Sequence, residues 1–316
     1  MTETSSKLKK IDMRDAFFDQ IYDMAKENND LIFLTADHGA FSLVKFEEDY
    51  PERYINIGIS EQNMIGSAAG LAASGKITFA YGITPFVSLR VLEQLTIDVA
   101  SMDLSVNVVS VGGGFTYSTD GPTHQGLQDL PAVNTIPNMT IFNSSDPAST
   151  RAFAKISAKE PGPKYIRIEK GYLPDLRDDT HDFSKGFDQI KEGKDLTIVA
   201  TGAIVHEAKK VSDILFEENG LEVGVIDLYR IKPLPSDDLI AALSETTNVL
   251  TLEEGYLDGG MGSIIGTLLA DNGINSKFLR CGIKNTFCFN YDTRESLLKI
   301  YEIDALSIIK KVKTWL

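Results

Sequence analysis

The sequence predicts an α/β protein of two consecutive domains, each a mostly parallel sheet covered by helices. Short apolar segments typical of buried strands alternate with segments of helical period along the whole chain. A length of 316 residues is enough for two domains of ordinary size. A polar, charged stretch over 175–194 interrupts the alternation and is typical of an interdomain linker. We therefore expect domains over 1–178 and 194–316, joined by a linker over 179–193.

The elements of the first domain follow from apolar period and from glycine and proline breaks. Apolar residues recur at helical spacing over 12–28, which predicts the first helix. Apolar runs predict strands, and the intervening periodic segments predict helices. In order, we expect strands at 31–35, 54–59, 76–83, 106–111, 139–142 and 164–168, with helices at 62–74, 85–102 and 147–159. The helix over 62–74 is rich in glycine and alanine, a composition that allows close packing on a neighbour.

The second domain repeats the alternation. We expect strands at 196–200, 222–228, 249–252 and 278–281, with helices at 204–219, at 236–243, after the glycine-rich turn at 255–262, and from 293 onward. The glycines of that turn lack the full spacing and the acidic partner of a dinucleotide-binding loop. We therefore interpret them as sites of close helix–sheet packing.

Composition excludes several classes of protein. The chain has 31 Lys and Arg against 45 Asp and Glu, a net charge of −14, which would repel nucleic acid and anionic membranes. The first ten residues lack the apolar core of a signal peptide, and no apolar run approaches the roughly 20 residues of a membrane span. Cys281 and Cys288 are too few for a disulfide framework or a metal knuckle. We expect a cytoplasmic protein with reduced thiols and no nucleic-acid or membrane partner.

Candidate functional residues stand in loops that follow predicted strands. His38 follows the first strand, and the long loop over 112–126 carries Asp120 and His124. Ligands in open α/β sheets bind at the carboxyl ends of strands, and loops longer than about 12 residues in compact domains are usually functional. An imidazole there can exchange protons near neutral pH. A polar loop fastened by its own hydrogen bonds is the alternative that these residues leave open.

Glu61 stands between an apolar strand and a helix, at the positive end of the helix dipole. Its local chemistry fits a helix cap, whereas its apolar flanks favour a buried glutamate presented to a ligand. The two remaining histidines, His181 in the linker and His206 on a helix, are expected to be solvated. No serine-hydrolase elbow or paired zinc-ligand motif occurs in the sequence.

Three motifs occur in the order and spacing of the transketolases. They are Thr35-Ala-Asp37, Gly58-Ile-Ser-Glu61-Gln-Asn-Met64 and Asp120-Gly-Pro-Thr-His124-Gln-Gly126. Over almost its whole length the chain resembles the C-terminal half of a split, two-chain transketolase. The resemblance implies a pyrimidine-binding domain followed by a transketolase C-terminal domain. It also implies an enzyme that depends on thiamine diphosphate and moves a two-carbon ketol unit from a ketose to an aldose.

The resemblance implies roles for ten residues. Glu61 would hydrogen-bond a ring nitrogen of the cofactor's aminopyrimidine and, with His124, would be catalytic. Phe86, with Val87 as the competing position, would place an aromatic ring against the aminopyrimidine. The implied cofactor-binding set is Glu61, Phe86, Ile59 and Arg90. The implied substrate-binding set is Arg14, His38, Ser42, Asp120, His124 and Lys170, of which Asp120 and His124 would contact the donor sugar and Arg14 the acceptor phosphate.

The sequence departs from the family in two substrate positions and lacks one motif. Lys170 stands near the place of an expected arginine, and Gly112 stands where many transketolases have histidine. Both departures favour a modified or unphosphorylated sugar. The Gly-Asp-Gly motif that binds the diphosphate and a divalent metal, Mg²⁺ or Ca²⁺, does not occur in the 316 residues. A diphosphate without metal ligands would be an uncompensated charge, so we expect an N-terminal transketolase subunit to supply that domain in an α2β2 assembly.

Three alternatives stay open. Deoxyxylulose-phosphate synthases share the Asp120–Gly126 run in similar form, whereas the run disfavours beta subunits of 2-oxo-acid dehydrogenases. A non-catalytic, transketolase-like scaffold subunit is a third alternative. The joint presence of Glu61, Asp120 and His124 disfavours the scaffold.

Overall fold

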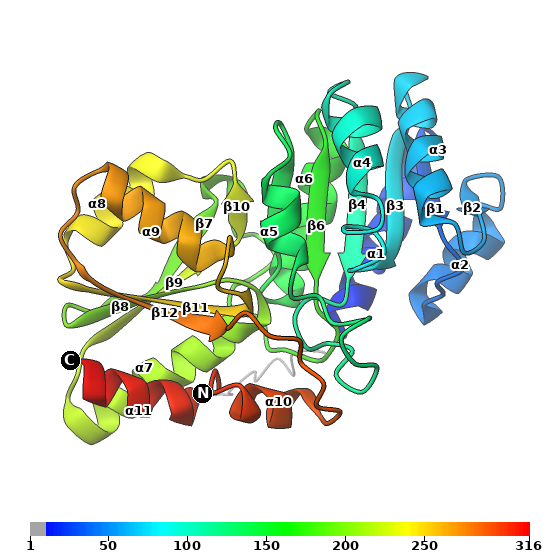
Figure 1. Cartoon of the computed structure of the whole chain (residues 1–316). Helices are drawn as coiled ribbons and strands as arrows, with labels where there is room; N and C mark the ends of the chain where they lie inside the picture. Colours follow the sequence, from blue (N-terminus) through cyan, green and yellow to red (C-terminus); the bar gives the residue numbers. More distant parts are fainter. Residues whose placement is uncertain (1–10) are drawn as a thin grey trace, which may run out of the picture.

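The computed structural model describes residues 11–316 as two α/β domains packed side by side (Figure 1). Each domain is built on a mostly parallel sheet, one of seven strands and one of five, so the predicted fold class is confirmed. Residues 1–10, where we expect no signal peptide, lie outside the described residues. Within 11–316, none of the helices combines the length and the apolar character that crossing a membrane requires.

The first sheet has the strand order β10-β5-β6-β4-β3-β1-β2, and only its edge strand β10 is antiparallel to its neighbour. Its strands are β1 (Leu31–Thr35), β2 (Tyr54–Asn56), β3 (Ile77–Ile83), β4 (Val106–Val111), β5 (Thr140–Asn143), β6 (Lys164–Ile168) and β10 (Arg230–Lys232). The side chains of β1, β4 and β6 are buried throughout, as expected for parallel strands covered on both faces. Because β10 comes from the second half of the chain, the second domain completes the first sheet.

Helices cover both faces of the first sheet. On one face lie α1 (Met13–Glu27), α2 (Phe41–Asp49) and α6 (Pro147–Lys159); on the other lie α3 (Glu61–Ala73), α4 (Leu92–Gln94), the π-helix η1 (Leu95–Ala100) and α5 (Asp129–Asn134). The side chain of Asp12 caps α1, and Asp146 forms a reciprocal capping box with Ser149 in α6. These caps fix where the two long helices begin.

The second sheet has the strand order β12-β11-β8-β9-β7, with β7 antiparallel at the edge. Its strands are β7 (Phe187–Lys191), β8 (Leu196–Ala200), β9 (Val223–Leu228), β11 (Asn248–Tyr256) and β12 (Lys277–Ile283), and its helices are η2 (Phe183–Lys185), η3 (Gly202–Ile204), α7 (Val205–Asn219), α8 (Ser236–Ser244), α9 (Met261–Asp271), α10 (Arg294–Ile300) and α11 (Ala305–Trp315). Figure 1 shows α8 and α9 on one face and α7 and α11 on the other. Ile65 of α3 and Met261 of α9 belong to one hydrophobic core, so the two domains pack against each other through that core.

Several predicted boundaries are wrong at polar and glycine positions. The expected helix over 85–102 is a series of turns up to Val91, followed by α4 and η1. Its first turn is diverted because Ser88 Oγ donates to the carbonyl of Thr84 (2.6 Å). The expected strand over 54–59 ends at Asn56, since Gly58 adopts a φ of 73°. The helix α2 and the strand β7, the latter inside the predicted linker, are additional elements.

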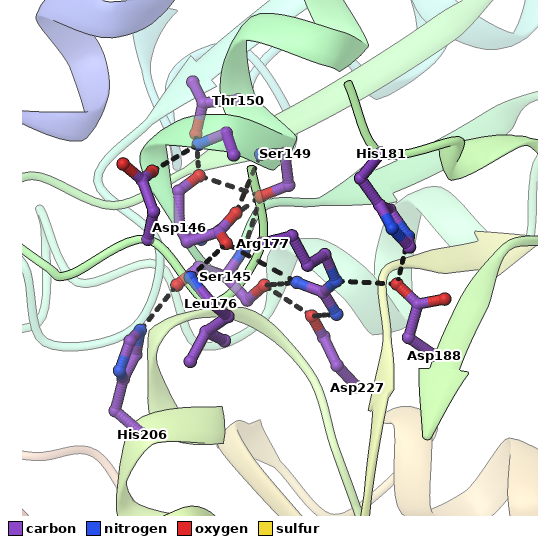
Figure 2. A network of polar contacts seen from close by, with 12 residues as sticks. Ser145, Asp146, Ser149, Thr150, Leu176, Arg177, His181, Asp188, His206 and Asp227 are labelled. Atoms are coloured by element: carbon purple, nitrogen blue, oxygen red, sulfur yellow. Dashed lines mark hydrogen bonds and ion pairs between the residues drawn. The ribbon is translucent and has the colours of Figure 1, made fainter. Parts of the chain in front are cut away.

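Arg177, in the polar stretch over 175–194, joins the two domains (Figure 2). Arg177 Nε donates to Asp188 of β7 (2.6 Å), and its Nη2 donates to Asp227 of β9 (2.6 Å). The same guanidinium lies 3.6 Å from Asp146, the cap of α6 in the first domain. Arg177 therefore connects three carboxylates that belong to the second sheet and to a helix of the first domain.

The two histidines that we expected to be solvated have protein partners around this contact (Figure 2). His181 Nε2 lies 2.7 Å from Asp188, and His206 Nε2 lies 2.9 Å from the carbonyl oxygen of Ser145. Burial lowers the pKa of His206. The expectation was wrong for His206, because the helix face that carries it is covered by the first domain, whereas the side chain of His181 is 32% exposed.

A buried carboxyl group predicts how stability depends on pH. Glu253 on β11 accepts from the N–H groups of Met261 and Gly262 (both 2.8 Å), and burial raises its pKa from 4.5 to about 7. A raised pKa means that the folded state binds the proton more tightly, so this contribution is present below pH 4.5 and is lost as pH rises through about 7. The free energy of unfolding of wild type minus that of Glu253→Gln should fall over this range. Urea titrations at several pH values measure it, and a difference that rises with pH would contradict the assignment.

Candidate functional site

The site is organised around Glu61, the first residue of α3. Its side chain is 2% exposed, and its Oε2 accepts from Arg90 Nη1 (2.7 Å). Its Oε1 is buried and has no hydrogen-bond partner in the described part of the chain. The carboxylate therefore lies beside two sources of positive potential, the N-terminus of α3 and the Arg90 guanidinium. A buried carboxylate oxygen without a protein donor is suited to accept a hydrogen bond from a ligand.

Arg90 and Phe86 form one wall beside this carboxylate. The guanidinium of Arg90 lies 4.2 Å from the centre of the Phe86 ring, a cation–π contact. The Phe86 ring meets the His124 ring edge-on at 5.2 Å between centroids. Val87 is fully buried in the hydrophobic core, so Phe86 rather than Val87 faces this group of residues.

His124 comes from the loop between β4 and α5, which we call the 112–126 loop. Its backbone N–H donates to the carbonyl of Gly121 (3.0 Å), and its Nδ1 lies 2.9 Å from Thr123 Oγ1. Its ring also contacts that of Tyr117 at 6.3 Å. Asp120 is exposed in the same loop and donates its backbone N–H to the carbonyl of Tyr117 (3.2 Å). The loop thus carries an imidazole and a carboxylate within one short turn.

Two basic residues from other segments, Lys170 and Arg14, lie near Tyr117 and Tyr81. Lys170 Nζ lies 5.1 Å from the Tyr117 ring centre. Arg14 of α1 is a hydrogen-bond and electrostatic partner of the Tyr81 hydroxyl. Burial raises the pKa of both tyrosines, and Arg14 partly opposes this rise, so both phenols stay protonated. This end of the site combines neutral hydroxyls with two cations, a set suited to an anionic group.

His38 and Ser42 extend the site towards α2. The His38 ring lies 6.2 Å from that of Tyr81, and its buried Nδ1 has no partner in residues 11–316. Desolvation lowers the pKa of His38, although the charge of Glu61 opposes this shift. Ser42 Oγ donates to Asp15 (3.1 Å), which also pairs with Arg14 at 3.2 Å. Burial therefore favours the neutral imidazole of His38, which lies near enough to Glu61 for the carboxylate to oppose this effect.

The structure brings most of the predicted residues into one connected set. Glu61, Arg90, Phe86 and His124 form a chain of direct contacts, and Tyr117 and Tyr81 join it to the basic end. Ile59 is 76% exposed and stands outside this chain of contacts. Sequence reasoning missed both tyrosines. Their positions could have identified them as candidates for the site. Tyr81 lies near the carboxyl end of a buried strand, and Tyr117 lies in a glycine-rich loop.

The residues present fit one half of a thiamine diphosphate site. The free Oε1 of Glu61 matches a ring N–H donor, and the half-buried Phe86 ring offers an aromatic surface beside it. Within residues 11–316, no three His, Cys, Asp or Glu side chains are grouped so that they could hold a metal ion. The fit therefore concerns the aminopyrimidine side of the cofactor.

Comparisons with known proteins identify both domains of the chain. Residues 9–175 match the family model "Transketolase, pyrimidine binding domain" and residues 187–308 match "Transketolase, C-terminal domain". The chain is 35% identical over 305 residues to a "Putative transketolase C-terminal section" of Methanocaldococcus jannaschii, covering 95% of both chains. It is 33% identical to an apulose-4-phosphate transketolase subunit of Phocaeicola vulgatus, covering 82% of this chain and 84% of that one.

A solved structure described as "Split gene transketolase, inactive beta4 tetramer" superposes with a TM-score of 0.88 at 31% identity, covering 97% of this chain and 98% of that one. The predicted resemblance is confirmed over both domains. This chain belongs to the transketolase family and consists of its pyrimidine-binding domain followed by its C-terminal domain.

Proposed function

We propose that this chain is the pyrimidine-side subunit of a thiamine-diphosphate-dependent transketolase that moves a two-carbon ketol unit from a ketose to an aldose. The observation that carries the proposal is the buried Oε1 of Glu61, which has no donor in the described chain and lies beside the Phe86 ring and Arg90. We place the pyrimidine-binding domain at 1–178 and the C-terminal domain at 194–316, with the linker at 179–193. A cytoplasmic location is part of the same proposal.

The residues of this chain would orient the cofactor and manage protons. When bound, thiamine diphosphate supplies the nucleophilic carbon and the electron sink for the two-carbon fragment. Glu61 would accept a hydrogen bond from the aminopyrimidine at Oε1, while Arg90 holds its Oε2. Phe86 would cover one side of the ring and exclude water from it. His124, whose imidazole faces Phe86, exchanges a proton with the sugar oxygen next to the bond that is made or broken.

The substrate would enter on the side of the 112–126 loop. Asp120 and His124 contact the hydroxyls of the donor sugar, and His38 contacts a carbonyl or hydroxyl oxygen near Glu61. Arg14 and Lys170 contact the far, anionic end of the sugar beside Tyr81 and Tyr117, with Ser42 held next to Arg14 through Asp15. The substitutions at Lys170 and Gly112 support a modified sugar as substrate.

A second chain would complete the site. We propose an N-terminal transketolase subunit that carries the diphosphate ligands and the Mg²⁺ or Ca²⁺ site, in an α2β2 assembly. The Phocaeicola vulgatus relative is itself named as one subunit of a transketolase, which supports an enzyme of more than one kind of chain. The solved β4 tetramer of a split transketolase is described as inactive, which supports a need for the other chain. Ile59, 76% exposed just before α3, is available to meet the cofactor or that chain.

Reconstitution with a candidate N-terminal subunit tests the function. The pair should transfer a two-carbon unit from a ketose to an aldose when thiamine diphosphate and Mg²⁺ are present. Release of carbon dioxide from pyruvate, without transfer of a ketol unit from a ketose, would instead favour the synthase or the 2-oxo-acid dehydrogenase type. Full turnover by a pair in which this chain carries Glu61→Ala would favour a scaffold role.

A further inference from the structure

The 112–126 loop is anchored in the second domain, although β4 of the first domain leads into it. Phe115 is fully buried in the core of the second domain and stacks on Tyr301 at 5.4 Å between ring centroids. Leu127, just beyond the other end of the loop, is 3% exposed in the same core and accepts at its carbonyl from the N–H of Tyr256 on β11 (3.0 Å). Both ends of the loop are therefore fixed by apolar burial on the second domain.

Two glycines close the neck of the loop. Gly114 and Gly126 exchange two backbone hydrogen bonds, of 2.7 and 2.9 Å. Gly114 has a φ of 59°, and a Cβ added there would lie 2.5 Å from the carboxylate of Glu254. The chain thus passes directly against that carboxylate, which comes from β11 of the second domain. Only a residue without a side chain permits this approach.

Glu254 binds the neck from one side, and Arg167 binds it from the other. Glu254 Oε1 accepts from the backbone N–H of Phe115 (2.6 Å), and both carboxylate oxygens accept from the guanidinium of Arg294, with 3.1 Å for Nε to Oε1. Arg167 Nη2 donates to the carbonyls of Gly126 (2.8 Å) and of Glu254 itself (3.2 Å). The Glu254 side chain is 1% exposed, and charge-assisted hydrogen bonds in so dry a place are strong and directional.

We infer that Glu254 is a positioning residue: through Phe115 it fixes the neck of the 112–126 loop and so sets where Asp120 and His124 meet the donor sugar. The inference rests on the proposed function for the role of those two residues. The second domain would thereby influence donor binding through Glu254, which itself contacts neither substrate nor cofactor. Glu61 and Arg90 come from other elements and pair with each other rather than with Glu254, so cofactor affinity should not depend on it.

Matched variants on one strand test the inference. Glu254→Gln keeps the shape but weakens the ionic contacts, and Glu253→Gln changes an equally buried neighbour whose partners are Met261 and Gly262 in α9. Hydrogen–deuterium exchange of this chain alone should show the 115–126 amides exchanging about tenfold faster in Glu254→Gln. Glu253→Gln should leave them unchanged. Arg294→Gln removes the guanidinium that orients Glu254 and should speed the exchange of the same amides. It provides the test of the inference if Glu254→Gln does not fold.

In the reconstituted pair, Glu254→Gln should raise KM for the ketose donor about tenfold, with a smaller change in kcat and the same affinity for thiamine diphosphate. Unchanged exchange in both Glu254→Gln and Arg294→Gln would overturn the inference, as would an equal rise of KM in Glu253→Gln. The exchange measurement needs no substrate, so it tests the positioning role of Glu254 independently of the proposed function. If the variants exchange faster but the reconstituted pair transfers no two-carbon unit, the proposed function is refuted and the positioning role is kept.

Discussion

Replacing Glu61 by alanine should lower kcat of the reconstituted pair about 10³-fold, the range expected when a group that handles a proton is lost. The carboxylate is 2% exposed and keeps its Oε1 free, so the substitution removes the acceptor that we assign to the aminopyrimidine. Folding should be preserved, because Arg90, its partner, is 44% exposed and can be solvated when the carboxylate is removed. The measurement is kcat at saturating cofactor, together with the melting temperature.

Glu93→Gln is the matched control, since Glu93 is a glutamate in the neighbouring helix α4 that takes no part in the site. It should leave kcat unchanged. The N-cap of α3 is Ser60, and Glu61 makes no capping hydrogen bond within residues 11–316, so the capping role that the sequence left open is wrong. A Glu61→Ala pair that retains more than about a tenth of the turnover would show that the cofactor meets another acid. Glu61→Asp, which retracts the carboxylate while keeping its charge, should also lose turnover, because hydrogen-bond geometry rather than charge is required.

Replacing Arg167 by methionine should have the largest effect on stability. Arg167 is 2% exposed, and its guanidinium donates to Asp129 (2.9 Å), Glu169 (3.0 Å) and the carbonyl of Gly126 (2.8 Å). Removing it leaves Asp129 and Glu169 buried without their counter-charge, although Tyr165 and the N–H of Ala203 still donate to them, and this costs about 3–5 kcal/mol. That loss is a large part of the roughly 5–15 kcal/mol by which whole domains are stable. Thermal unfolding should show a melting temperature lower by about 10 °C.

Two further variants separate this charge effect from loss of side-chain volume. Arg151→Met removes an ion pair with Asp179, which is 63% exposed, and a longer one with Asp175 (3.5 Å), and should cost about 1 kcal/mol or less. Adding Asp129→Asn and Glu169→Gln to Arg167→Met should recover about half of the loss, because the buried groups are then neutral. An Arg167→Met protein as stable as wild type would show that water reaches these carboxylates.

The sequence was sufficient for the fold class because buried parallel strands are continuous apolar runs, as in β4 and β8. It failed where a side chain or a distant strand decides the local structure. The Ser88 hydroxyl redirects the chain after Pro85, and β10 forms only because the distant strand β5 offers an edge. Neither effect leaves a periodic pattern in the residues themselves.

The candidate site likewise contains residues that the sequence could identify and residues that it could not. Glu61 and His124 could be named because their motifs stand at the carboxyl ends of strands. Tyr81 could not, since a tyrosine in an apolar strand has the composition of a core residue. The partners Glu254 and Arg294 lie more than a hundred residues from the loop that they hold, so only the packing of the two domains reveals them.

A cofactor titration tests most directly the central claim that this chain holds only half of a shared site. Thiamine diphosphate with Mg²⁺ is titrated by calorimetry into the isolated chain, into the candidate N-terminal subunit and into the mixture. We expect saturable binding in the mixture, at an affinity at least about a hundredfold above that of this chain alone, because the diphosphate would otherwise lack metal ligands. Binding to the isolated chain as tight as binding to the mixture would contradict the claim.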